Sequence, residues 1–216
     1  MSLLETIKGV PKAVLVGYLA PFIALSGIAI SIGLSPSFDW SANALSDLGH
    51  YTRTDIGPDP LVRAIVFNIG LAATGILMIV ITIGFMMQLK DLPTRIAMVP
   101  FLVAAGFLTL IGIFSENFSP THRIVSEGLF MSFPFAMWFV GLSWLRFPRL
   151  RWFSVISLLL PFVSVYLWSG TFAGTMPWTG VAIPELLTAF TAIIWVWLIL
   201  TLEVKGHLEP VLAGGE

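Results

Sequence analysis

Six long stretches of mostly apolar residues alternate with short polar segments along the chain. A helix needs about 20 such residues to cross the hydrocarbon core of a membrane, and each stretch reaches that length. None of the stretches alternates strictly between apolar and polar residues, so the pattern favours helices over strands. The chain is therefore predicted to be all-α, a single membrane domain of residues 1–216 whose six transmembrane helices cover approximately residues 11–34, 61–87, 95–115, 122–145, 152–172 and 181–203.

Proline and capping residues mark the expected starts of three helices. Asp59 precedes Pro60 and Ser119 precedes Pro120, so each pair offers a capping side chain followed by a proline at the first helical position. Pro184 lies early in the sixth stretch. The first stretch is longer than the apolar core of a signal peptide, which is about 7–15 residues, and we expect a retained helix there.

The composition agrees with a protein that lies in a membrane. Hydrophobic residues make up 57% of the chain and charged residues only 11%, whereas soluble domains carry about 25% charged residues. The net charge of −1 excludes the broad basic surface that binds nucleic acid. The chain has no cysteine, which excludes disulfides and thiolate metal sites. Membrane lipids are the expected partners. The sequence leaves open whether the protein forms a homo-oligomer.

The basic residues of the connecting segments predict how the chain is oriented. Cytoplasmic loops of membrane proteins carry an excess of lysine and arginine. With six helices, both termini lie on the same side as the 88–94 and 146–151 connections. That side has eight basic residues and the other has three, namely Lys8, Lys12, Lys90, Arg95, Arg146, Arg149, Arg151 and Lys205 against Arg53, Arg63 and Arg123. The sequence therefore predicts a multi-pass protein of the cell membrane with cytoplasmic N- and C-termini.

The polar stretch SANALSDLGH, residues 41–50, lies in the first outer loop. We expect a short interfacial helix there, with Ser41 as its N-cap and Gly49 just past its end. Helical spacing gathers its polar residues into one stripe, namely Asn43, Ser46, Asp47 and His50. The stripe faces either water at the membrane surface or a site inside the bundle, and the pattern leaves both open.

A second polar segment joins the third and fourth stretches. His122 is expected in the first turn of the fourth helix, where the helix dipole disfavours the charged imidazolium and keeps the neutral ring that a base or metal ligand needs. Ser126 lies one turn deeper on the same face. Glu127 beside it is an ionisable group inside a membrane helix, and such groups are usually functional.

Three further polar side chains flank these helix starts. Glu116 and Asn117 precede the fourth helix, where they either cap helix ends or contribute to a site. Glu185 lies in the first turn of the sixth helix, and a capping role explains it unless it points toward the other two segments. Together the three outer segments predict a polar pocket on the extracytoplasmic face.

One hypothesis for this face is a metal-dependent hydrolase of lipid-like substrates. Histidine and carboxylate side chains are ligands for a divalent metal such as zinc, which activates water. The candidate ligands are His50, His122, Asp47 and Glu116. Glu127 or Glu185 would be the base, and Ser46 would contact the substrate or take part in catalysis. The chain contains neither HExxH nor HxxxH. A serine hydrolase built from Ser46 or Ser126 with His122 and a carboxylate is a further alternative, although no GxSxG motif supports it.

The other hypothesis is binding rather than catalysis, and it ranks slightly higher. A lipid or small ligand would contact the polar residues of the outer segments, namely Asn43, Ser46, Asp47, Asn117 and Ser126. An accessory or structural membrane protein belongs to the same class. A channel or transporter is disfavoured, because no ionisable residue lies near the centre of a predicted span.

Three motifs resemble a known family. The stretches NALSDLG, PLVRAIVFNIGL and LIGIFSENFSPTHRIVS are similar to the membrane family called domain of unknown function 998, and the similarity covers nearly the whole chain. The resemblance implies a six-helix membrane protein and no known activity. Its motif positions correspond to Ser46, Asp47, Gly49, Glu116 and His122. Ser115 is a departure, since the family often has proline before the acidic residue.

Overall fold

The computed structural model describes residues 11–214, and these residues form helices and loops without a strand. The longer helices are α2 (Lys12–Gly33), α3 (Pro60–Gln88), α5 (Val99–Ile113), α6 (Thr121–Trp144), α8 (Pro161–Phe172) and α9 (Ala182–Val204). The shorter ones are α4 (Leu92–Ala97), α7 (Arg151–Leu159), α10 (Glu209–Ala213) and the 3₁₀ helices η1 (Leu45–Gly49), η2 (Glu116–Phe118) and η3 (Pro148–Leu150). Lys8, one of the basic residues counted above, lies outside the described residues.

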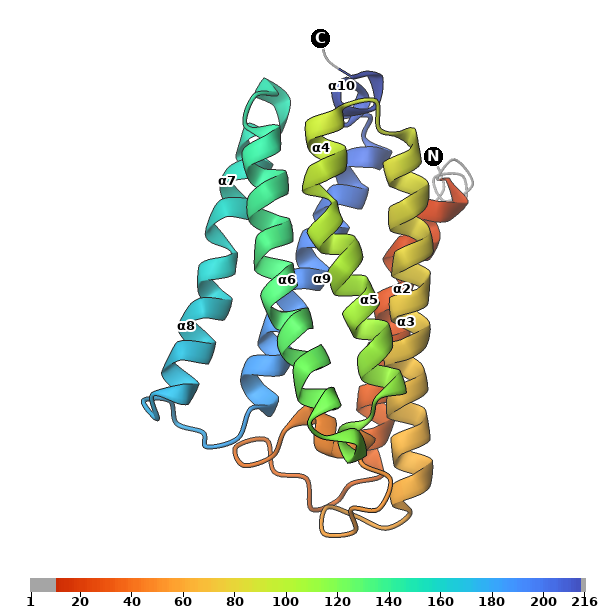
Figure 1. Cartoon of the computed structure of the whole chain (residues 1–216), viewed down its shortest axis with the longest axis vertical. Helices are drawn as coiled ribbons and strands as arrows, with labels where there is room; N and C mark the ends of the chain where they lie inside the picture. The colour runs from red at the N-terminus through yellow and green to blue at the C-terminus, as the bar shows by residue number, and fades with distance from the viewer. Residues whose placement is uncertain (1–10, 215–216) are drawn as a thin grey trace, which may run out of the picture.

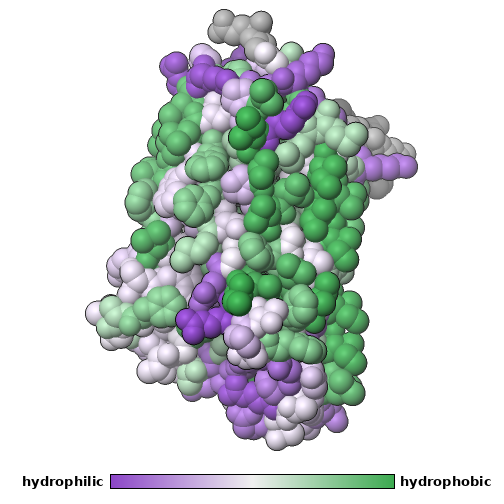
Figure 2. Space-filling model, viewed as in Figure 1, coloured by the Kyte–Doolittle hydropathy of each residue, from purple (hydrophilic) through white to green (hydrophobic). Residues whose placement is uncertain are grey.

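Six segments are long and apolar enough to cross a membrane, which confirms the prediction of six spans. They are Lys12–Gly33, Pro60–Gln88, Leu92–Ile113, Thr121–Trp144, Pro148–Phe172 and Ala182–Val204. Figure 2 shows hydrophobic residues over the middle of the face in view and hydrophilic residues at its two ends. A wide apolar surface of this kind is compatible with surrounding lipid, whereas in water it would cause protein molecules to associate with one another. The chain therefore has the architecture of a multi-pass helical membrane protein.

The helices form a ring in which each one packs against its neighbours in the chain (Figure 1). α2 packs on α3, α3 on α5, α5 on α6, and α6 on α7 and α8, while α9 closes the ring between α8 and α2. Both described chain ends lie at one end of this ring together with α10, and we call it the termini end. The opposite end is built by residues 34–59, 114–120 and 173–181, and we call it the loop end.

Proline divides two of the spans that the pattern predicted as single helices. α4 ends at Ala97 and α5 begins at Val99, next to Pro100. α7 ends at Leu159, and Pro161 begins α8. Proline lacks the backbone N–H, and its ring clashes with the carbonyl four residues earlier. The third and fifth spans therefore each consist of helical pieces joined at a break.

Two predicted helix caps are wrong in detail. Pro60 is the first residue of α3 as expected, but Asp59 has a φ of 53° and its side chain caps nothing. A capping residue normally has an extended backbone, so this left-handed conformation turns the side chain away from the free N–H groups. Ser119 is not the cap of α6 either. That helix begins at Thr121, so His122 is its second residue rather than its third.

Candidate functional site

The segment 39–43 at the loop end is a turn held by its own side chains, not the start of a helix. The Asp39 carboxylate accepts hydrogen bonds from the Ser41 backbone N–H at 2.8 Å and from its hydroxyl at 2.7 Å. The Asn43 side chain accepts one from the Asp39 N–H at 2.8 Å. Such local bonds compete with helix formation. The expected helix from Ser41 is therefore wrong, and only the 3₁₀ helix η1 forms, from Leu45.

Residues 41–43 instead hold the start of α9. The Asn43 carbonyl accepts hydrogen bonds from the backbone N–H groups of Val181 at 3.1 Å and Ala182 at 2.9 Å. These are N–H groups that the first turn of a helix leaves without partners. Gly180 permits the approach, because a Cβ there would collide with the Asn43 carbonyl oxygen. The Asn43 side chain, predicted to bind a ligand, is occupied within its own loop.

Glu185 connects α9 to η1. Its Oε2 accepts a hydrogen bond of 2.6 Å from the backbone N–H of Leu45, the first residue of η1. Leu45 and Leu48 are buried, so η1 covers the loop end of the ring with two leucine side chains. The carboxylate therefore points toward the first of the two polar segments that a role in a shared site requires it to face.

Gly49 lets η1 pack directly against α3. The Asn68 side chain donates a hydrogen bond of 3.0 Å to the Gly49 carbonyl. A Cβ on Gly49 would lie only 2.6 Å from the Asn68 Oδ1 and 2.9 Å from the Phe67 ring. The position therefore requires glycine because of close packing rather than because of a helix C-cap.

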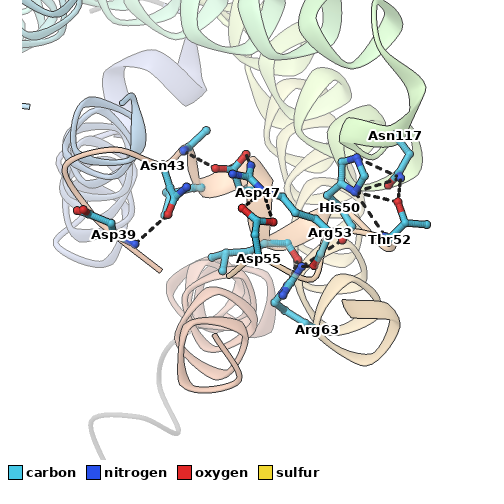
Figure 3. Close-up of polar contacts among 12 residues, drawn as sticks. Asp39, Asn43, Asp47, His50, Thr52, Arg53, Asp55, Arg63 and Asn117 are labelled. Carbon is cyan, nitrogen blue, oxygen red and sulfur yellow. Dashed lines mark hydrogen bonds and ion pairs between the residues drawn. The ribbon is translucent and has the colours of Figure 1, made fainter. Parts of the chain in front are cut away.

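Asp47 is the centre of a charged cluster at the loop end (Figure 3). Its carboxylate pairs with Arg53 and accepts a hydrogen bond of 3.0 Å from the Ala44 backbone N–H. Arg53 also bonds Asp55 at 2.9 Å, and this hydrogen bond lowers the pKa of Asp55. Glu116 lies against Asp47, and burial together with the Asp47 charge raises the pKa of Glu116 to about 7. The interaction between the carboxyl groups of Asp47 and Glu116 thus connects η1 to η2.

The sequence pattern indicates only the positive charge of Arg63, whereas the structure shows what its side chain contacts. It is 0% exposed, and its guanidinium donates to the carbonyls of Leu48 at 3.4 Å, His50 at 3.3 Å and Arg53 at 2.7 Å. Its side chain therefore fixes the loop between η1 and α3 (Figure 3). An arginine four residues into an apolar span is a recognisable signal of such an internal role.

His50 and Asn117 link the two outer loops to each other. The Asn117 side chain accepts a hydrogen bond of 3.0 Å from the Tyr51 backbone N–H, and its amide nitrogen lies 3.2 Å from His50 Nδ1. Figure 3 shows both side chains beside Thr52, away from Asn43. The polar residues of the segment 41–50 therefore point in different directions rather than along one stripe.

The predicted ligands of a metal centre are not brought to one point. Within residues 11–214 no three His, Asp or Glu side chains are arranged to hold a metal ion. His122 is bonded elsewhere, with Nδ1 at 2.7 Å from the Phe114 carbonyl and Nε2 at 3.3 Å from Ser126 Oγ. Glu127, a candidate base, lies on the surface and accepts a hydrogen bond from Arg123 at 2.7 Å.

A partly open cavity of about 160 Å³ lies between the helices and is bordered by η1. Its lining comes from η1, α2, α3, α5, α6 and α9, and it is apolar apart from five residues, namely Ser46, Thr74, Ser126, Glu185 and Thr188. Thr74 donates to the Ala20 carbonyl on α2 and Thr188 accepts from Trp168 on α8, so both hydroxyls are engaged with neighbouring helices. Ser46, Ser126 and Glu185 all lie at the loop end. The pocket predicted as polar is thus apolar with a polar end.

Comparison with known proteins gives one match. Residues 18–202 match the model of a family described as protein of unknown function (DUF998). The match covers most of the 216 residues and includes η1, the start of α6 and nearly all of α9. No curated protein and no solved structure matches the chain.

Proposed function

The chain belongs to the DUF998 family, whose description assigns no activity, and we propose from its geometry that it binds a membrane lipid. A segment of an acyl chain fills the cavity inside the ring. The polar part of the lipid lies at the loop end, against Ser46, Ser126 and Glu185. The observation that carries this proposal is the division of one cavity into a long apolar part and a short polar end.

The size and chemistry of the cavity agree with such a ligand. A cavity of about 150 Å³ with an apolar lining stays dry and takes up apolar molecules of the size of benzene. The cavity of about 160 Å³ has the same capacity, which corresponds to part of an acyl chain. Hydroxyl and carboxylate groups at one end fix the orientation of a ligand, as polar groups do in other largely apolar sites.

We propose that this polar end lies on the extracytoplasmic side of the cell membrane. The termini end carries more lysine and arginine than the loop end, and such segments are retained in the cytoplasm. Six crossings leave both termini on one side of the membrane, and this distribution of charge favours the cytoplasm for that side. The lipid headgroup would then be in the outer leaflet.

Retention of lipid by the purified protein tests the proposal. Ala192 is 6% exposed and lines the cavity, so Ala192→Phe fills part of the space. Ile194 lies on the same helix and is 49% exposed, so Ile194→Phe is a matched control that changes only the outer surface. Native mass spectrometry in detergent should show a bound lipid on the wild type and on Ile194→Phe, with at least about tenfold lower occupancy on Ala192→Phe. Equal occupancy in all three proteins would exclude the cavity as the binding site.

A further inference from the structure

The pair Ser126 and His122 lies where the apolar cavity meets its polar end. Both residues are on α6, one turn apart, and Ser126 lines the cavity while His122 is buried behind it. The His122 Nε2 is 3.3 Å from Ser126 Oγ. This distance is slightly longer than a catalytic hydrogen bond, which tightens when substrate is bound.

The hydrogen bonds of His122 fix which ring nitrogen carries the proton. Nδ1 lies 2.7 Å from the Phe114 carbonyl oxygen, which can only accept, so Nδ1 is the donor. In the neutral ring, Nε2 then has a free lone pair and accepts the proton of the Ser126 hydroxyl. A nucleophile, a base and a group that orients the base are therefore present in the order that nucleophilic catalysis requires.

The depth of Ser126 matches the position of a lipid ester. α6 has 24 residues, which gives a length of about 36 Å. The hydrocarbon core is about 30 Å thick, so each helix end extends about 3 Å beyond it. Ser126 is five residues after Thr121, so it lies about 8 Å along the helix and about 5 Å inside the hydrocarbon boundary. The acyl esters of glycerolipids lie close to that boundary.

Ser46 supplies a further polar group at the same end of the cavity. Ser46 is one of the residues that line the cavity from η1, and no hydrogen bond joins its hydroxyl to another of the described residues. It is thus available to donate to the carbonyl oxygen of an ester, where negative charge develops during acyl transfer. Glu185 lines the same cavity from the first turn of α9.

We propose that Ser126 and His122 hydrolyse an acyl ester of a glycerolipid bound in the cavity, an activity that rests on the lipid binding proposed above. Ser126 Oγ attacks the ester carbonyl carbon, and its proton moves to His122 Nε2. The bond between the carbonyl carbon and the glycerol oxygen then breaks, and that oxygen takes the proton from Nε2. Water next attacks the acyl-serine, passes a proton to Nε2 and releases a fatty acid, and the proton returns to Ser126 Oγ.

A fluorophosphonate probe tests the nucleophile directly, because it forms a covalent bond with an activated serine and releases fluoride. The wild type in phosphatidylcholine vesicles should be labelled at Ser126, as located by mass spectrometry of peptides. His122→Gln keeps hydrogen-bonding groups at this position but lacks the base, so labelling should slow at least about 100-fold. Ser132→Ala is the matched control, since Ser132 is on the same helix and donates to the Gly128 carbonyl. Its labelling should equal that of the wild type.

Substrate turnover and lipid retention separate this proposal from lipid binding itself. Vesicles containing a diacylglycerophospholipid with a fluorescent acyl chain should release the fluorescent fatty acid with the wild type and not with Ser126→Ala. The labelling rate of the wild type should rise with pH as the imidazole loses its proton, a readout that does not depend on how well a variant folds. Lipid retained in the cavity without labelling of Ser126 overturns hydrolysis and leaves binding intact. If the wild type neither retains lipid nor is labelled at Ser126, both proposals are overturned.

Discussion

Within η1, four of the five residues serve the packing of the loop end and one does not. Leu45 and Leu48 fill the end of the ring, Asp47 caps its own segment and pairs with a cation, and Gly49 allows contact with α3. Ser46 faces the cavity without an internal partner among the described residues. The motif LSDLG thus combines a structural role with one group free to meet a ligand.

Replacing Gly49 with alanine should destabilise the protein. The new Cβ would meet Asn68 Oδ1 at 2.6 Å and the Phe67 ring at 2.9 Å, and overpacking of this kind costs about 1–3 kcal/mol. A Cβ on Gly84 in α3 would have no atom within 4 Å, so Gly84→Ala should be neutral or stabilising by about 0.5–1 kcal/mol. Thermal unfolding in detergent checks both variants, and a Gly49→Ala protein as stable as Gly84→Ala would contradict the packing described.

At the scale of elements, η1 is held from three directions. The start of α9 binds it through Glu185, α3 binds it through Asn68, and η2 meets it through Glu116. These contacts come from segments that are far apart in the sequence. The short helix is therefore a joint between the outer ends of the bundle, and its contact with η2 includes Glu116, a carboxyl group whose pKa is raised.

Glu116 should make the stability of the protein depend on pH. Its pKa is raised from 4.5 to about 7 in the folded protein. The folded chain therefore binds more protons than the unfolded chain between these values, and the stability contributed at low pH is lost as the pH rises through 7. The Tm of the wild type should fall more between pH 5.5 and 8 than the Tm of Glu116→Gln. The surface variant Glu127→Gln should keep the wild-type dependence, and parallel curves for wild type and Glu116→Gln would contradict the assignment.

The elements themselves differ in how far the sequence predicts them. The length and apolar character of the six spans are local properties, so the pattern predicts their bounds to within four residues. The predicted position of η1 is wrong because the side-chain bonds of Asp39 and Asn43 compete with a helix from Ser41. The role of Arg63 depends on three carbonyls of a folded loop. The cavity depends on the spacing between helices, and hydropathy does not predict this spacing.

At the scale of the whole molecule, the two ends of the ring have different roles. The termini end is closed by α10, in which Val211 is buried, and by Leu208 before it. The loop end combines η1, the charged cluster of Asp47 and the polar end of the cavity. The orientation of the chain therefore decides which leaflet supplies the lipid whose polar part is proposed to lie at the loop end.

Single cysteines can test this orientation, because the chain has none of its own. Ser37 is exposed at the loop end, and Gln88 is exposed at the termini end of α3. A membrane-impermeant maleimide added to intact cells should label Ser37→Cys and should label Gln88→Cys only after the cells are opened. The reverse pattern would place the polar end of the cavity in the cytoplasm.

Photo-crosslinking measures most directly whether a lipid occupies the interior of the ring. The protein is illuminated in vesicles that contain a phospholipid with a diazirine in its acyl chain, and crosslinked residues are located by mass spectrometry. A lipid inside the ring should crosslink to cavity residues such as Leu129, Phe133 and Ala192, and these crosslinks should be lost in Ala192→Phe. Crosslinks confined to lipid-facing residues such as Ile124 and Ile194 would contradict it.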